Sequence, residues 1–185
     1  VARCNSQDYV RLRLTRLEDR IVFDGAGVVA DLQPGPANSA PAALIPFNQA
    51  IYFSASGINS SGQFVGRELY RLDANGSVQL VADINPGAAD SNPADFAFFD
   101  GKLVFAATGA LGREIYQLDS SGTVSLLADV NPGIASSNPQ LLTEFSDKLY
   151  FSAVASAGRE IYVLNRGGNT SLIADLNPGP ADSNP

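Results

Sequence analysis

The chain contains no histidine, no methionine, no tryptophan and a single cysteine, Cys4. The lack of histidine excludes a histidine general base, a Ser-His-Asp triad and a histidine-ligated zinc site. One cysteine cannot form an intrachain disulfide or a thiolate metal cluster. Basic residues are also few, since 12 Lys and Arg stand against 19 Asp and Glu and give a net charge of −7. This balance argues against a nucleic-acid-binding protein, which needs a basic face.

Long apolar runs are lacking as well. No segment approaches the roughly 20 apolar residues of a membrane span, and no secretory signal peptide is visible. The 185 residues are nevertheless 45% hydrophobic and only 17% charged, so the chain has enough apolar side chains to bury a core. The length indicates one domain, or part of one.

What the sequence does contain is a repeat with a period of 46 residues. The same offset relates Ala-Asp-X-Asn-Pro-Gly segments that begin at Ala82, Ala128 and Ala174. An earlier copy begins at Ala30, 52 residues upstream of Ala82, because the loop over residues 54–65 is six residues longer than its later counterparts. The most regular charged feature is a triplet that recurs as Gly66-Arg67-Glu68, Gly112-Arg113-Glu114 and Gly158-Arg159-Glu160.

Each repeat predicts four short strands. Residues 68–72 and 77–84 alternate apolar and polar side chains around an Asn-Gly turn, and residues 96–99 and 102–107 flank the Asp100-Gly101 turn. Four strands in one period are typical of a propeller blade, whereas solenoid coils usually repeat in about 20–30 residues. We therefore predict an all-β fold, in which four-stranded antiparallel blades form an incomplete β-propeller.

The predicted division of the chain has two parts. Residues 30–185 hold about three and a half repeat units and stop inside a repeat, whereas propellers close with roughly 4–8 blades. Unclosed sheet edges are prone to pair, so we expect the rest of a longer protein, or another copy, to complete the ring. Residues 1–29 form a basic leader, expected to be partly disordered or helical.

Several segments recur in the same order in every copy. In one copy they are Glu68-Leu69-Tyr70-Arg71-Leu72-Asp73, a Gly-Ser turn, residues 80–87 (Leu-Val-Ala-Asp-Ile-Asn-Pro-Gly) and residues 101–105 (Gly-Lys-Leu-Val-Phe). This order resembles the ELWxxDGT repeat of large bacterial secreted or surface proteins. Tyr70, Tyr116 and Tyr162 stand where that family has tryptophan. The family's Asp-Gly-Thr turn is matched only in part, because other residues separate the Asp, Gly and Thr positions or replace them. The resemblance implies an extracellular, propeller-like repeat with no defined reaction.

The leader has a resemblance of its own. Residues 17–26 (Leu-Glu-Asp-Arg-Ile-Val-Phe-Asp-Gly-Ala) are similar to the LEPR-type segment near the start of large exported bacterial proteins. Asp19 stands where that segment commonly has proline. Both resemblances imply an extracellular or cell-surface location.

Two sets of residues are candidates for a functional site. The Gly-Arg-Glu triplets either place a ring of charge around a channel or, as we favour, fix blade spacing through bonds to backbone carbonyls or to a neighbouring blade. The second set, Asp83, Asn85, Asp90 and Asn92, lies in one oxygen-rich loop of the kind that suits Ca²⁺, although turn chemistry explains it as well. No other cofactor is expected. The recurring aromatic residues are expected in the core between blades, and the longer loop at 58–65 is expected to be a surface loop.

These observations lead to a functional prediction. We expect a noncatalytic repeat scaffold of an exported bacterial protein, with no catalytic residues, that recognises a protein or carbohydrate at a cell surface or serves in adhesion. Two alternatives stay open, namely the repeat portion of a larger secreted enzyme and a Ca²⁺-binding propeller module. Neither a nucleic acid nor a membrane span in this chain is expected.

Overall fold

The computed structural model describes residues 28–183 and Pro185, all in strands, turns and loops. The expected leader and its LEPR-like segment fall almost entirely within residues 1–27, outside the described part, as does Cys4. No helix in the described part is long and apolar enough to cross a membrane.

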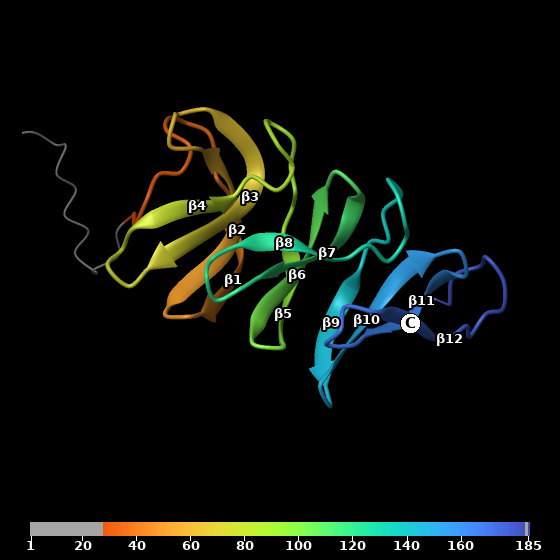
Figure 1. The fold of residues 1–185 in the computed structure, drawn as a ribbon. Helices are drawn as coiled ribbons and strands as arrows, with labels where there is room; N and C mark the ends of the chain where they lie inside the picture. The colour runs from red at the N-terminus through yellow and green to blue at the C-terminus, as the bar shows by residue number, and fades with distance from the viewer. Residues whose placement is uncertain (1–27, 184) are drawn as a thin grey trace, which may run out of the picture.

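In this described part, twelve strands form three separate four-stranded antiparallel sheets, each in the order of the sequence (Figure 1). The first sheet contains β1 (Ala42–Phe47), β2 (Ala50–Ile58), β3 (Phe64–Asp73) and β4 (Val78–Ala82). The second contains β5 (Ala94–Phe99), β6 (Lys102–Gly109), β7 (Gly112–Leu118) and β8 (Val124–Ala128). The third contains β9 (Gln140–Phe145), β10 (Lys148–Ala155), β11 (Gly158–Leu164) and β12 (Thr170–Ala174). We call these sheets blades 1, 2 and 3.

This architecture confirms the predicted fold, which is all-β with the four-stranded blades of an incomplete β-propeller. Each blade begins after the Ser-X-Pro segment and ends before the Asn-Pro-Gly loop. The Gly-Arg-Glu triplet therefore lies in the middle of a blade, at or near the start of the third strand, rather than at its beginning.

The hairpins within the blades follow from local sequence. Asp100 and Gly101 both have positive φ, at 51° and 71°, and they join β5 to β6 in a two-residue turn. Two consecutive left-handed residues match the right-handed twist of the flanking strands, which is why an Asp-Gly pair is favoured there.

Two of the three apolar clusters lie between blades, and the third packs Phe53 and Tyr70 of blade 1 against Leu32. Tyr52 and Leu69 of blade 1 pack in one cluster with Leu103 and Phe105 of blade 2. Val104 and Ile115, together with other residues of blade 2, pack against blade 3 in a second cluster that includes Leu149, Phe151 and Tyr162. Each blade thus buries both faces of its sheet only when it has a neighbour on each side.

The first strands of the three blades lie next to one another. β1 contacts β5, and β5 contacts β9. The Leu141 N–H donates to Asp95 Oδ1 at 3.2 Å, and these two residues belong to neighbouring blades. The first strands therefore form the inner edge of the arc.

Candidate functional site

The glutamates of the Gly-Arg-Glu triplets are fully buried. Glu68 Oε2 accepts hydrogen bonds from the Ile84 N–H at 2.8 Å and from Ser91 Oγ at 2.6 Å, and Glu68 Oε1 accepts from the Ser91 N–H at 2.8 Å. The carboxylate therefore ties the third strand of blade 1 to the loop that leads into blade 2. The same three bonds recur from Val130 and Ser137 to Glu114, and from Leu176 and Ser183 to Glu160.

Burial changes the acidity of these groups. Desolvation raises the pKa of Glu68 to about 7, against the opposing effect of the hydrogen bonds from Ser91 and Ile84. Burial likewise raises the pKa of Glu114 above its usual value. The side chains are enclosed by the fold, so they have no access to a ligand from solvent. Their arrangement serves the connection between blades.

The arginines of the triplets point the other way from the glutamates, because neighbouring residues on a strand face opposite sides of the sheet. The Arg113 guanidinium donates to the Asn92 carbonyl at 2.8 Å, in the loop that enters the same blade. Arg67 donates to the Ala40 carbonyl at 2.7 Å, and Arg159 donates to the Asn138 carbonyl at 3.1 Å. No ion pair joins a triplet arginine to a glutamate within residues 28–183. The guanidinium groups thus hold backbone carbonyls and do not form a free ring of charge.

The glycines of the triplets are required by close packing. Gly66 has a φ of +74°, and a Cβ there would lie 2.5 Å from the Ala89 carbonyl oxygen. Gly112 and Gly158 have similar φ values and approach the corresponding loops of their own blades. A side chain at these positions would clash with the loop that the neighbouring glutamate binds.

The four residues of the predicted Ca²⁺ loop each take part in hydrogen bonds of the loop and its neighbours. Asp90 Oδ1 accepts from the Arg67 N–H at 2.8 Å, and the Asn85 amide donates to the Asp90 carbonyl at 3.1 Å. Asn92 uses its carbonyl for Arg113. Asp83 Oδ2 accepts from the Gly87 N–H at 3.2 Å, whereas its Oδ1 is buried without a partner.

The unpartnered oxygen of Asp83 recurs at Asp129 and Asp175 in the next two repeats. Within the described residues, no group of three or more Asp, Glu, His or Cys side chains is placed to hold a metal ion. A Ca²⁺ site here would therefore depend on backbone or amide oxygens beside one aspartate. Ca²⁺ binding stays a prediction.

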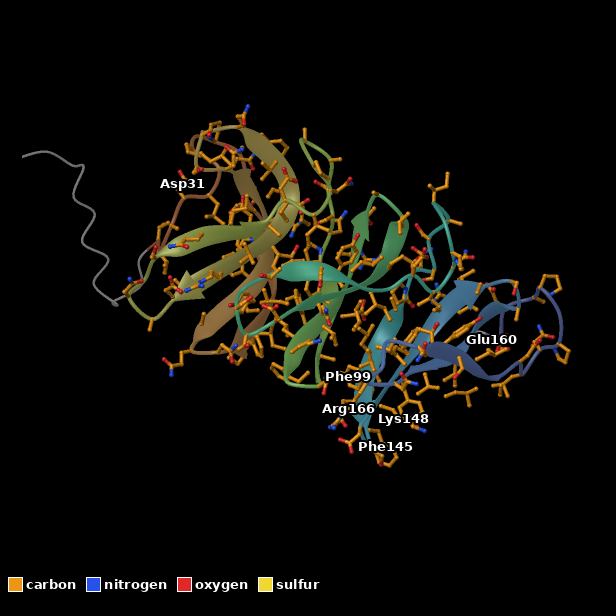
Figure 2. All side chains as sticks on the ribbon, viewed as in Figure 1. Asp31, Phe99, Phe145, Lys148, Glu160 and Arg166 are labelled. Carbon is orange, nitrogen blue, oxygen red and sulfur yellow. The ribbon has the colours of Figure 1, made fainter. Side chains whose placement is uncertain are left out.

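A different cluster, which the sequence analysis did not single out, lies where blades 2 and 3 meet. Arg166 Nη2 contacts Asp147 Oδ1 at 2.5 Å, and Arg166 Nε lies 3.5 Å from Asp100 Oδ1. These side chains border a shallow hollow of about 280 Å³ that Phe98 and Glu144 also line. We call it the rim hollow. Figure 2 shows Arg166 near Phe99, Phe145 and Lys148 at the turn end of blade 3.

The rim hollow gathers several charged residues that do not recur, whereas elsewhere such residues, for example Arg71 and Asp95, stand apart from one another. Arg166 corresponds to Ser120 and Ala74, and Asp147 corresponds to Gly101. Glu144 corresponds to Phe98 in the preceding repeat. The signal that would have located this cluster is the set of positions where charge departs from the repeat.

Phe105, Phe151 and Tyr162 lie in the clusters between blades, as expected. Phe53 and Tyr70 instead pack with residues of blade 1 and with Leu32, and Phe145 is 67% exposed. Phe105 stacks with Tyr116 at a centroid distance of 6.3 Å, and Phe151 stacks with Tyr162 at 6.1 Å. The stacked pairs lie on neighbouring strands of one blade. The longer loop lies at the surface, where Asn59 Oδ1 accepts from the backbone N–H groups of Ser61 and Gln63. Neither feature gathers groups that could carry chemistry.

Comparison with known proteins shows a similar fold in solved structures but does not assign the chain to a family. No protein-family model matches the chain, and no curated protein matches it. Sixteen chains of solved structures do match. A gluconolactonase from Xanthomonas campestris is 21% identical, with 80% of this chain and 50% of that chain covered and a TM-score of 0.48. A protein proposed to be a gluconolactonase is 19% identical, with 83% and 54% covered and a TM-score of 0.49.

A third similar structure is a streptogramin B lyase, which is 16% identical over 76% of this chain and 56% of that chain, with a TM-score of 0.43. The chain thus spans about half the length of these proteins. At such identities the likeness concerns the fold alone.

These neighbours correct one prediction. We expected a chain that is not an enzyme, but the similar structures include a gluconolactonase and a lyase, so that prediction is wrong. The physical reason is that the lack of histidine and of a second cysteine excludes only chemistry that needs those groups. Carboxylates, which are plentiful here, also serve as acids and bases. A fold moreover does not by itself determine whether its loops carry catalysis.

Proposed function

We propose that this chain is a propeller module of an exported bacterial protein and that it recognises a protein or carbohydrate at a cell surface through the rim hollow. The observation that carries the proposal is that four charged residues without charged counterparts in the other repeats line one hollow, namely Arg166, Asp147, Asp100 and Glu144. A group that merely holds blades together is expected in every copy. A cluster of charged side chains found in one repeat only is expected to contact a ligand that binds at that one place.

The chemistry of the rim hollow supports recognition of a polar, uncharged or partly cationic ligand. Three carboxylates and one guanidinium supply many acceptors and a fork of donors. Phe98 is exposed beside them and offers an apolar ring face. Carbohydrate ligands combine hydroxyl groups with apolar C–H faces, so this combination suits them.

The same hollow also supports the alternative of a propeller portion of a larger secreted enzyme. Glu144 and Asp147 adjoin each other there, since the Asp147 N–H donates to Glu144 Oε1 at 3.0 Å. Neither carboxylate recurs with the repeat, and both are exposed to solvent. Accessible carboxylates are what acid–base chemistry on a sugar requires.

The test is binding of cellohexaose, maltohexaose and chitohexaose to the full chain, measured by calorimetry. We expect at least one to bind, and Arg166→Ala and Phe98→Ala to weaken that binding severalfold. The matched control is Arg71→Ala, because Arg71 pairs with Asp73 within blade 1, away from the hollow. Binding that survives Arg166→Ala, or no binding by any of the three sugars, would contradict carbohydrate recognition at this place. Release of reducing ends during the titration would favour the enzyme.

A further inference from the structure

Residues 28–41 occupy the place of the last strand and exit loop of a blade that precedes blade 1. Their sequence begins as the other exit loops do, with Ala30-Asp31-Leu32 in the place of Ala82-Asp83-Ile84. Ser39 takes the place of Ser91, since the Ser56 N–H donates to the Ser39 carbonyl at 2.8 Å.

The equivalent bonds elsewhere show that this placement is the same in all three blades. The Thr108 N–H donates to the Ser91 carbonyl, and the Val154 N–H donates to the Ser137 carbonyl, both at 2.7 Å. Arg67 binds the Ala40 carbonyl as Arg113 binds the Asn92 carbonyl. Segment 28–41 is thus docked on blade 1 as each later exit loop is docked on the blade that follows it.

One partner is missing from this segment. In every later copy, a buried glutamate from the preceding blade accepts three hydrogen bonds from the exit loop, as Glu68 does from Ile84 and Ser91. The equivalent donors here are the Leu32 N–H, the Ser39 N–H and the Ser39 hydroxyl. Within residues 28–183, no glutamate accepts from them. The three donors form an empty carboxylate socket of the same design as three filled ones.

The segment beside the socket, which is not a strand here, is also without a neighbour in the described part. Val28 and Val29 stand where Leu80 and Val81 stand in β4, and they are 87% and 62% exposed. Next to them, Leu44, Ile51 and Phe53 line an apolar hollow of about 270 Å³ on the free face of blade 1. At the contact between blades 2 and 3 the equivalent face is covered, because Leu142, the counterpart of Leu44, is 8% exposed whereas Leu44 is 63% exposed.

We propose that segment 28–41 is the fourth strand and exit loop of a further blade, and that it binds a three-stranded partial blade of this same repeat. The third strand of that partner carries a Gly-Arg-Glu triplet. Its glutamate accepts the three hydrogen bonds that Leu32 and Ser39 offer, while its strand pairs with residues 28–30. This inference does not depend on the function proposed for the rim hollow.

The chain itself supplies the partner when it is shortened to residues 1–166. That variant keeps β9, β10 and β11 but loses β12 and the exit loop, so Glu160 loses Leu176 and Ser183 as donors. Segment 28–41 of a second molecule then has the partner described above. We expect the shortened chain to associate head to tail, as a closed dimer or larger ring, and the full chain to associate much more weakly at the same concentration. Sedimentation equilibrium measures both.

Point variants of the shortened chain test the socket itself. Glu160→Gln and Ser39→Ala should each weaken association about tenfold or more, since each removes one side of the carboxylate contact. The matched controls are Glu144→Gln, on the exposed end of β9, and Ser60→Ala, in an exposed turn. A shortened chain that is folded by circular dichroism yet monomeric up to about 100 µM overturns the proposal. So does association that neither socket variant weakens.

A second measurement decides the matter if the shortened chain does not fold. The full chain, labelled with ¹⁵N, is titrated with a peptide of residues 157–166 and with its Glu160→Gln form. We expect the amide signals of Leu32 and Ser39 to shift with the first peptide and much less with the second. No shift of these two amides up to about 1 mM peptide overturns the proposal.

Discussion

Glu114 and Ser137 are 23 residues apart in sequence and share two hydrogen bonds of 2.6 Å, from the Ser137 N–H and from its hydroxyl. Both side chains are fully buried. The Ser137 carbonyl in turn accepts from the Val154 N–H of blade 3. The pair therefore links the third strand of one blade to the second strand of the next through a single serine. Blade spacing in this protein depends on a buried carboxylate rather than on a salt bridge.

The buried carboxylate makes stability depend on pH. The pKa of Glu68 is about 7 in the folded chain, above its ordinary value of 4.5, so between these pH values the folded state binds more protons than the unfolded state. The free energy of unfolding should therefore fall as pH rises from about 4.5 to about 7, by up to about 3 kcal/mol from this group.

The measurement is urea unfolding of the wild type and of Glu68→Gln across that range. The variant should lose most of the pH dependence that Glu68 contributes, while Glu144→Gln, at the exposed end of β9, should retain it. Equal slopes with pH for wild type and Glu68→Gln would show that Glu68 titrates normally.

The guanidinium of Arg113 should matter more than that of Arg166. Arg113 is half-buried and holds the Asn92 carbonyl, whereas Arg166 is 57% exposed and forms surface ion pairs. We expect Arg113→Ala to cost about 1–3 kcal/mol of unfolding free energy, and Arg166→Ala less than about 1 kcal/mol. Arg113→Lys should restore little, because an ammonium lacks the planar fork. Chemical denaturation compares the three, and similar costs for both alanine variants would refute the distinction.

The repeat pattern shows how much sequence alone could give. The strands and the four-stranded blades follow from alternation and turn residues that each copy carries locally. The hydrogen bonds of the buried Glu68 carboxylate could not be foreseen from the sequence. Their donors, Ile84 and Ser91, are 16 and 23 residues away and meet the carboxylate only after the loop folds back. The rim hollow was missed because Asp100 and Arg166 come from different blades.

A glycine in the second strand should be sensitive to enlargement. A Cβ on Gly109 would lie 2.1 Å from Tyr116 Oη, and Ala155 stands at the equivalent position of blade 3. We expect Gly109→Ala to cost about 1 kcal/mol, since the tyrosine ring must shift within a packed interface. The double variant with Tyr116→Phe should recover most of that loss. Thermal melts measure the coupling, and additive effects of the two substitutions would contradict a direct clash.

The Ca²⁺ prediction has a direct test at Asp83. If the loop binds the ion, millimolar Ca²⁺ should raise the melting temperature of the full chain relative to a sample in EDTA, because a ligand that binds only the folded state stabilises it. Asp83→Asn should reduce that rise, whereas Asp119→Asn, in an exposed turn, should not. A melting temperature that is the same with Ca²⁺ and with EDTA would remove the prediction.

The sequence by itself determined the period, the four strands per repeat and the hairpin turns, since these depend on residues close together in the chain and repeated in every copy. Where each blade begins came only from the tertiary structure, which splits the predicted unit over residues 68–107 between two blades. Only the tertiary structure decided the role of the charged residues that recur in every repeat. Burial between the third strand and a distant loop turned Glu68, Glu114 and Glu160 into internal acceptors. Within residues 28–183, the same docking of loops on blades left one socket, at Leu32 and Ser39, without a carboxylate.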